Sequence, residues 1–257
     1  MNNPVIGFIG VGELALYTIK GVRSGGFSGT INLSPRNQEK ADFLKNNFDC
    51  KVLVDNQAVA DSSDYIILAT RPDDCLDALT ALKLNKNKTL ISVVAGVSVA
   101  QLKNCIVNDI KIVRAMPVSS AEAISSPTLV FPANSFVEQF FNYCGNSCVV
   151  SEESIFEQGS VLACVYSWFF ALYDELIQAT QSDKLPPELA AQLVMGMAKG
   201  AAELALQNKD QTPAEIAASI ATEGTYSKMG LDLIKQRDGF AAWQDACQLL
   251  KGKLSAP

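Results

Sequence analysis

The chain has no histidine among its 257 residues. This absence excludes catalysis by an imidazole acid or base and removes the commonest zinc ligand. No other set of metal-ligating residues clusters in the sequence, so we expect no metal site. The seven cysteines are scattered, and none are spaced as C-x-x-C. This pattern is typical of reduced thiols, and we expect most of them to be buried.

Positive charge is also scarce, since the net charge is −6 and the isoelectric point is about 4.8. A nucleic-acid partner is not expected, because such binding needs a basic surface. We expect no segment to span a membrane, because no apolar run has the required length and no basic and apolar leader opens the chain. These features predict a cytoplasmic protein. Its length is enough for two domains that each have a core.

The most informative segment is close to the N-terminus. The apolar residues Val5 to Ile9 predict a buried strand, which enters a Gly10-x-Gly12-x-x-Ala15 turn before a helix over 13–22. Gly10 permits the tight turn, Gly12 lets the backbone approach a pyrophosphate, and Ala15 lets helix and strand pack closely. The helix N-terminus then offers N–H groups to the anion. A glycine turn that merely joins two packed elements is the alternative.

The residues after the second expected strand, 30–33, indicate which dinucleotide is bound. An NAD site usually has an acidic residue here that binds the ribose 2′-hydroxyl. This chain has Ser34 and Arg36 instead, and a hydroxyl and a guanidinium suit a 2′-phosphate. We therefore expect NADP(H) as the cofactor. The alternative is that Arg36 is an ordinary surface side chain.

Strands and helices alternate through the first half. Further strands are expected at 51–54, 64–69, 89–94, 111–117 and 128–131, with helices at 38–46, 75–82 and 99–105. This alternation predicts an α/β fold with a doubly wound, Rossmann-type sheet, whose ligands bind outside the carboxyl ends of the strands. The residues that follow strands are therefore candidates for the site: Ser34, Asn56, 69–72, Ala95, Gly96 and 116–120.

The second half is helical in pattern. We expect helices over 156–178 and 188–207, another that begins at Thr212 with Glu215 as its capping-box partner, and two more over 229–235 and 240–251. The stretch 222–227 interrupts this pattern. We expect domains at 1–150 and 151–257. The segment 156–178 is too apolar for a lone surface helix and predicts a domain core or a subunit interface.

These motifs together resemble the pyrroline-5-carboxylate reductase family, nearly from end to end. Residues 7–15 are similar to its opening G-F-I-G-x-G-N-M-A, with Glu13 and Leu14 departing. Residues 34–36 resemble its S-x-R, 69–72 its A-V-K-P, 92–97 its S-x-A-A-G-I, 113–117 its V-R-A-M-P and 185–188 its L-P-R-E.

The resemblance implies NADPH-dependent reduction of 1-pyrroline-5-carboxylate, a cyclic imine, to L-proline in proline biosynthesis. It also implies an all-helical C-terminal domain that builds a homodimer or a higher homo-oligomer. The cofactor-binding residues implied by motif and resemblance are Gly10, Gly12, Glu13, Leu14, Ala15, Ser34, Arg36, Asn56, Ala69, Thr70, Arg71 and Pro72.

The departures from the family fall mostly in the substrate motifs. Val118 and Ser119 replace the start of an N-T-P, and residues 222–227 replace S-P-G-G-T-T, with Glu223 adding a carboxylate. We expect Val118, Ser119, Gly224 and Thr225 to line the substrate. Ser227 is the first candidate for the hydroxyl that faces the imine nitrogen, and Tyr226 is the second. A serine that caps a helix is the alternative for Ser227. Arg71 replaces the family lysine, and a solvated loop charge is its alternative.

Three functions remain open from the sequence. The first is a pyrroline-5-carboxylate reductase with an unusual pocket. The second is an NADPH-dependent reductase of another small imine or ketone. The third is a non-catalytic NADP-binding protein. The shape of the pocket distinguishes the first function from the second. The third predicts tight binding of NADPH without turnover of any imine.

Overall fold

The computed structural model describes residues 4–254. These residues divide into two compact units. The first unit consists of two segments, the residues up to Ala163 and those from Lys251 onward. The second unit is Cys164–Leu250.

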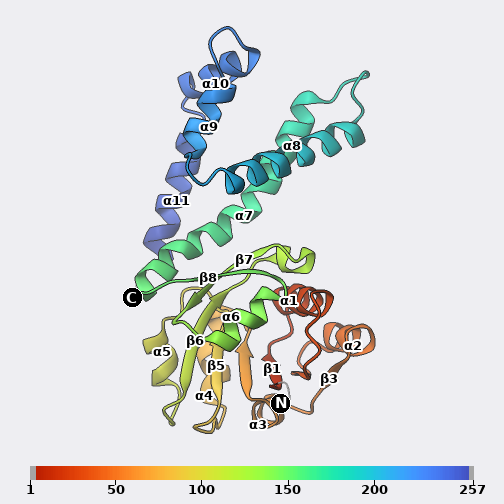
Figure 1. Cartoon of the computed structure of the whole chain (residues 1–257). Helices are drawn as coiled ribbons and strands as arrows, with labels where there is room; N and C mark the ends of the chain where they lie inside the picture. The colour runs from red at the N-terminus through yellow and green to blue at the C-terminus, as the bar shows by residue number, and fades with distance from the viewer. Residues whose placement is uncertain (1–3, 255–257) are drawn as a thin grey trace. The chain divides into compact units, whose positions relative to one another are not determined.

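The first unit is built on one eight-stranded sheet in the order β3-β2-β1-β4-β5-β6-β7-β8 (Figure 1). The strands are β1 (Ile6–Ile9), β2 (Ile31–Leu33), β3 (Cys50–Val52), β4 (Tyr65–Leu68), β5 (Thr89–Ser92), β6 (Lys111–Met116), β7 (Ser126–Phe131) and β8 (Gly145–Val149). The strands from β1 to β6 pair in parallel, β7 runs antiparallel to β6, and β8 is parallel to β7. The strand order reverses between β1 and β4, and doubly wound sheets bind their ligands at such a point.

Helices cover both faces of this sheet. They are α1 (Glu13–Ser24), α2 (Gln38–Asn47), α3 (Asn56–Asp61), α4 (Pro72–Thr80), α5 (Val99–Asn104) and α6 (Ser135–Asn142), with a short 3₁₀ helix η1 (Ser119–Ala123). Successive residues of β1 show why the strand is apolar throughout. Ile6 and Phe8 join one core cluster with Ile19 of α1, whereas Ile9 joins a second cluster with Leu79 of α4. A strand covered on both faces is apolar at consecutive positions.

The predicted doubly wound α/β fold is confirmed, and each predicted strand is present with both ends within two residues of the prediction. The helix expected at 75–82 begins earlier, at Pro72, because proline suits the first position of a helix. Four elements of this unit were not predicted from the sequence: α3, η1, α6 and β8.

The helical second half is also confirmed. Helix α7 (Glu153–Thr180) begins in the first unit, and α8 (Pro187–Gln207), α9 (Pro213–Ile220), α10 (Tyr226–Gln236) and α11 (Ala241–Leu254) follow. The expected capping box is present at α9, where the Glu215 N–H donates to Thr212 Oγ1 at 3.2 Å and the Thr212 N–H donates to the Glu215 carboxylate at 2.7 Å.

The expected break at 222–227 is shorter than predicted. Thr225 caps α10, since its hydroxyl accepts a hydrogen bond from the Lys228 N–H at 3.2 Å. Tyr226 and Ser227 therefore belong to the first turn of α10. The alternative interpretation of Ser227 as the helix cap is wrong, because Thr225 has that position.

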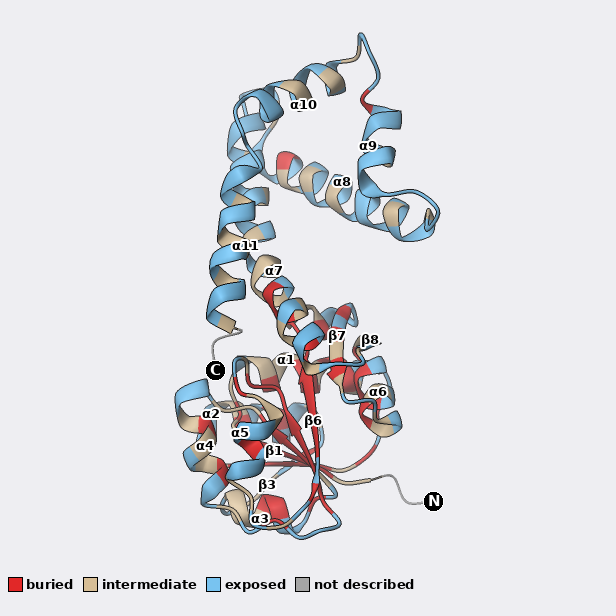
Figure 2. Ribbon diagram, turned by 90° about the vertical axis from the view of Figure 1, so that its left-hand side faces the viewer, coloured by how far each residue is buried: buried red, intermediate tan, exposed pale blue. Residues whose placement is uncertain are grey.

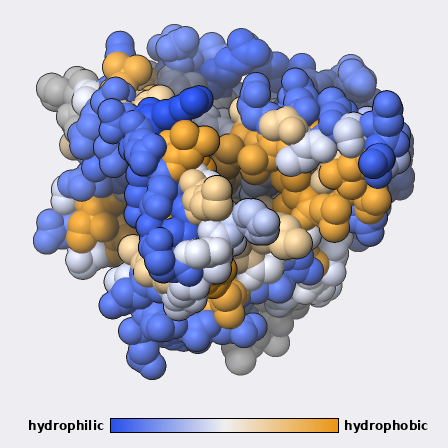
Figure 3. All heavy atoms as spheres, turned by 90° about the horizontal axis from the view of Figure 1, so that it is seen from above, coloured by the Kyte–Doolittle hydropathy of each residue, from blue (hydrophilic) through white to orange (hydrophobic). Residues whose placement is uncertain are grey.

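Apolar side chains of the second unit are largely uncovered within one chain. Figure 2 shows buried residues concentrated in the strands, while α8 to α11 are almost entirely half-buried or exposed. Met197 and Leu206 of α8 are 72% and 74% exposed, and Leu249 of α11 is 63% exposed. Apolar patches are visible between polar side chains in Figure 3. Exposed apolar side chains that gather in this way are typical of surfaces that contact another molecule.

The expectation that no apolar segment has membrane-spanning length is wrong. Among residues 4–254, α7 and α8 are long and apolar enough to cross a bilayer by length and composition alone. Length and composition are weak evidence, because helices that pack inside a protein meet the same two conditions.

The cysteines are less buried than expected. Cys50, Cys75 and Cys144 are buried, Cys148 is exposed, and the other three are half-buried. Burial raises the pKa of the Cys50 and Cys75 thiols to about 11 and that of Cys144 to about 12. These three thiols are therefore protonated and unreactive at neutral pH.

Candidate functional site

The glycine turn at the end of β1 leaves open space above the N-terminus of α1. Gly10 has φ +92°, and a Cβ there would lie 2.6 Å from the carbonyl oxygen of Ala69. Only glycine fits this position without a shift of the backbone. Gly12 precedes α1 without a side-chain cap, and a Cβ there would meet nothing within 4 Å. The first N–H groups of α1 thus face a space that an anionic group can enter.

A cavity of about 870 Å³ lies at this turn, at the carboxyl ends of β1, β2, β4 and β5. It brings together ten of the predicted cofactor-binding residues: Gly10, Gly12, Glu13, Leu14, Ser34, Arg36, Asn56, Ala69, Thr70 and Arg71. Two predicted residues do not line it. Ala15 lies on the buried face of α1, and Pro72 forms the first residue of α4.

Two buried hydroxyl groups, of Ser34 and Thr70, lie at the lining of this cavity. The Ser34 hydroxyl is fully buried and accepts a hydrogen bond from the Gly10 N–H at 3.0 Å, which ties the end of β2 to the glycine turn. Thr70 Oγ1 is buried without a hydrogen-bond partner in the described chain. Its polar neighbour is the Cys75 thiol, which is a weak partner. An unsatisfied hydroxyl at a cavity wall fits a polar ligand.

The cavity also contains charged residues that the sequence motifs did not indicate. Lys40 of α2 donates to the Glu13 carboxylate at 2.5 Å, and Arg36 donates to the Asp74 carboxylate at 3.0 Å. Arg71 lines the same space. The other lining residues that were not predicted as site residues are Ile9, Val11, Asn37, Gln38, Ala78 and Val93. Lys40 lies four residues beyond Arg36 and Asp74 two residues beyond Pro72, so both fall outside the predicted motifs.

The predicted substrate residues after β6 lie in the same unit but outside this cavity lining. Val118 is 8% exposed, and its N–H donates to the Ser126 hydroxyl at 3.0 Å. Ser119 starts η1 and is half-buried. A buried Val118 presents backbone rather than a side-chain donor at this position.

The other predicted substrate and catalytic residues belong to the second unit. Gly224 has φ +82°, a conformation that favours glycine, and it precedes the capping residue Thr225. Tyr226 is 91% exposed and Ser227 is exposed beside it. Their hydroxyl groups are open to a ligand or a partner subunit. Tyr166 of α7 is half-buried and packs edge-on against the exposed Phe170, with ring centroids 5.3 Å apart.

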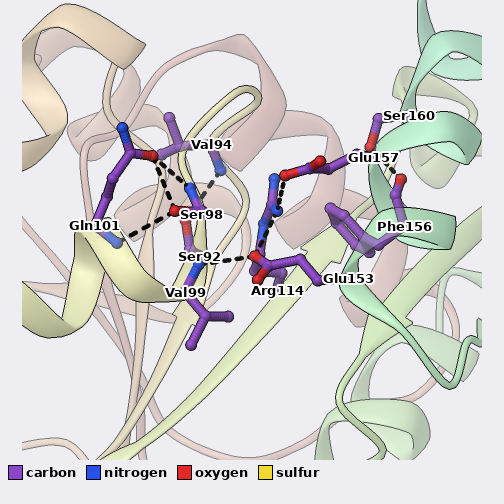
Figure 4. A network of polar contacts seen from close by, with 10 residues as sticks. All are labelled: Ser92, Val94, Ser98, Val99, Gln101, Arg114, Glu153, Phe156, Glu157 and Ser160. Carbon is purple, nitrogen blue, oxygen red and sulfur yellow. Dashed lines mark hydrogen bonds and ion pairs between the residues drawn. The ribbon is translucent and has the colours of Figure 1, made fainter. Parts of the chain in front are cut away.

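An ion cluster around the buried Arg114 joins β6 to the first turns of α7, and no spacing in the sequence predicts it. Arg114 is 1% exposed, and its Nη1 donates to Glu153 at 2.7 Å and to Glu157 at 3.3 Å (Figure 4). Its guanidinium lies 4.5 Å from the centre of the Phe156 ring. The Glu153 carboxylate also accepts the Val99 N–H at 2.7 Å. One carboxylate therefore fixes α7 to β6 and to the start of α5.

Comparisons with known proteins agree with this arrangement. Residues 5–96 match the family model described as NADP oxidoreductase, coenzyme F420-dependent, and residues 152–252 match the model for the pyrroline-5-carboxylate reductase dimerisation region. A curated pyrroline-5-carboxylate reductase of Escherichia coli (strain K12) is 29% identical over 209 residues, which is 76% of this chain and 78% of that protein.

The chain belongs to the pyrroline-5-carboxylate reductase family.

Solved structures of the pyrroline-5-carboxylate reductase family have the same fold. The enzyme from Streptococcus pyogenes superposes with a TM-score of 0.87 at 21% identity, covering 98% of both chains. The pyrroline carboxylate reductase from Plasmodium falciparum, a structure with NADP bound, gives a TM-score of 0.85 at 21% identity and covers 98% of this chain and 97% of that chain.

Proposed function

We propose that the chain is an NADPH-dependent reductase that converts 1-pyrroline-5-carboxylate into L-proline. The observation that carries this proposal is the cavity over the glycine turn, which gathers the dinucleotide motif, Ser34 and Arg36 at the point where the strand order reverses. Family membership over both the nucleotide-binding and the helical regions supports it.

The residues at this cavity fit a dinucleotide. The open space over Gly12 and the N–H groups of α1 suit the pyrophosphate, and Arg36 suits the ribose 2′-phosphate. Asn56, with 69–71, would hold the rest of the cofactor, while Ala15 keeps α1 close to the sheet and Pro72 sets the start of α4. When bound, NADPH supplies a hydride to the carbon of the C=N bond.

The chain itself has to orient the imine and polarise it. The hydroxyl of Ser227 would donate a hydrogen bond to the imine nitrogen, with Tyr226 as the second candidate. Val118, Ser119, Gly224 and Thr225 would border the substrate. The exposure of the Ser227 and Tyr226 side chains within one chain is consistent with this role.

We further propose that the protein works as a homodimer in the cytoplasm, through the helical region that matches the dimerisation model. The uncovered apolar side chains of α8 and α11 support this assignment. Light scattering at micromolar concentration should detect no monomer. A monomer that reduces substrate would contradict both the dimer and an active site completed by it.

The proposed reaction is tested by following NADPH oxidation at 340 nm with 1-pyrroline-5-carboxylate. A matched cyclic imine that lacks the carboxylate is the comparison, because Glu223 is a specific reason to consider a second substrate class. Like charges at close range are unfavourable, so Glu223 favours an uncharged imine if it faces the carboxylate. Preference for the uncharged imine would support that second function. Tight NADPH binding without turnover of any imine would leave only a binding role.

A further inference from the structure

Each of the two cations at the β2 end of the cavity is held by a carboxylate. Arg36 pairs with Asp74 of α4, and Lys40 pairs with Glu13 at the first position of α1. All four side chains line the same cavity. The end of β2 is where a doubly wound fold recognises the 2′ position of the adenine ribose.

The charges in this cavity nearly cancel. Its lining has three cations, Arg36, Lys40 and Arg71, and two carboxylates, Glu13 and Asp74. A phosphate monoester brings close to two negative charges at neutral pH. It can be bound well only if the cations turn from their carboxylates toward it. The pairs permit this exchange, because all four side chains reach solvent: Arg36 is 76% exposed, Asp74 41%, Lys40 26% and Glu13 60%.

We propose that Lys40 is a second cation for the 2′-phosphate of NADP(H), beside Arg36, and that Glu13 and Asp74 compete with this phosphate for the two cations. This inference rests on the proposed function and deepens it, since it names the residues that set the choice between NADPH and NADH. The two carboxylates lower the selectivity for NADPH below that of a cavity with unpaired cations.

The position of the two carboxylates separates their effects. Asp74 pairs only with Arg36 in the described chain and acts at the 2′ position. Glu13 stands at the N-terminus of α1, where the pyrophosphate would bind, so its charge also opposes the phosphates common to NADPH and NADH. Replacing Asp74 should therefore favour NADPH alone. Replacing Glu13 should favour both cofactors, and NADPH more.

The experiment is calorimetric titration of the full-length protein with adenosine 2′,5′-bisphosphate and with 5′-AMP, which lacks the 2′-phosphate. Lys40→Gln should lower the affinity for the bisphosphate by about fivefold to tenfold and leave the affinity for 5′-AMP nearly unchanged. Asp74→Asn and Glu13→Gln should each strengthen the bisphosphate by about twofold to fivefold, the range of an exposed ion pair. Added salt should lower the affinity for the bisphosphate more in the wild-type protein than in the double variant Arg36→Gln/Lys40→Gln.

Lys45→Gln on α2 and Asp73→Asn on α4 are matched controls, because both residues are exposed on the same helices but do not line the cavity. They should leave both affinities unchanged. In the Lys40→Gln background the gain from Glu13→Gln should shrink, because part of it acts through the pair. Unchanged melting temperatures show that each variant is folded.

The outcomes separate this inference from the proposed function. If the wild-type protein binds the bisphosphate no better than 5′-AMP, the site does not recognise a 2′-phosphate. This result would also refute NADPH as the cofactor. If the wild type prefers the bisphosphate but Lys40→Gln binds it equally well, the role of Lys40 is refuted and NADPH stands. Weaker binding by Asp74→Asn and Glu13→Gln would show that the carboxylates position the cations rather than compete.

Discussion

Replacing Arg114 by methionine should destabilise the first unit more than any surface change. The substitution removes a guanidinium that is 1% exposed and leaves Glu153 and Glu157 facing an apolar side chain. Breaking a buried ion pair from one side costs about 3–5 kcal/mol. The two carboxylates are 27% and 25% exposed and can turn partly to water, so we expect the free energy of unfolding to fall by about 2–3 kcal/mol.

A loss of this size lowers the melting temperature of a chain of this length by about 5–10 °C. The assay is thermal unfolding followed by near-ultraviolet circular dichroism, at one fixed protein concentration. Glu153→Gln should cost more than Glu157→Gln, because Glu153 is closer to Arg114 and also accepts the Val99 N–H.

The control is the triple variant Arg114→Met/Glu153→Gln/Glu157→Gln. It removes both signs of charge together, so most of the lost stability should return. A single Arg114→Met variant that melts with the wild type would refute the reasoning. So would a triple variant as unstable as the single one, since the cost would then arise from packing against Phe156 rather than from uncompensated charge.

Three further predictions concern separate parts of the chain. Arg36→Ala should lower the affinity for NADPH by about tenfold and barely change the affinity for NADH, as measured by quenching of tryptophan fluorescence. An equal loss of affinity for both cofactors would show that Arg36 does not bind the 2′-phosphate. Ile124 is a β-branched residue at φ +55° and 45% exposed, so Ile124→Gly should raise the free energy of unfolding by about 0.5–1 kcal/mol in urea titration, and no gain would show that the loop is unstrained. With Ellman's reagent at pH 8, the exposed Cys148 should react quickly, whereas the buried Cys144 should react only when the protein unfolds. Burial raises the pKa of Cys144 to about 12. In the folded protein this thiol should therefore become a reactive thiolate only as the pH approaches that value.

The glycine turn and the parallel strands could be predicted because their signals are local. A strand covered on both faces needs a continuous apolar run, and Gly10 needs a backbone conformation that few other residues adopt. Two of the missed elements, α3 and β8, lack such signals. Helix α3 has only six residues, and β8 lies at the edge of the sheet with the polar sequence GNSCV.

The site was predictable only as far as its motifs reach. The cofactor residues were found because each one follows a strand. Lys40 and Asp74 come into the cavity from the first turns of α2 and α4, and their partners are 27 and 38 residues away in sequence. Arg114 and Glu153 are separated by 39 residues, and only the folded chain brings them together. Pairings across such distances depend on tertiary structure, which no spacing rule encodes.

The scarcity of buried residues in the second unit has a thermodynamic consequence. Among the described side chains of Cys164–Leu250, the buried apolar residues are Ala190 and Ala221, two of the smallest. Burial of apolar area is the main favourable contribution to folding, so this unit can hold its structure only while another surface covers it. Its folding and its association are then one equilibrium, governed by mass action. The melting temperature should rise with protein concentration, and a dilute sample should lose its helical half before its sheet.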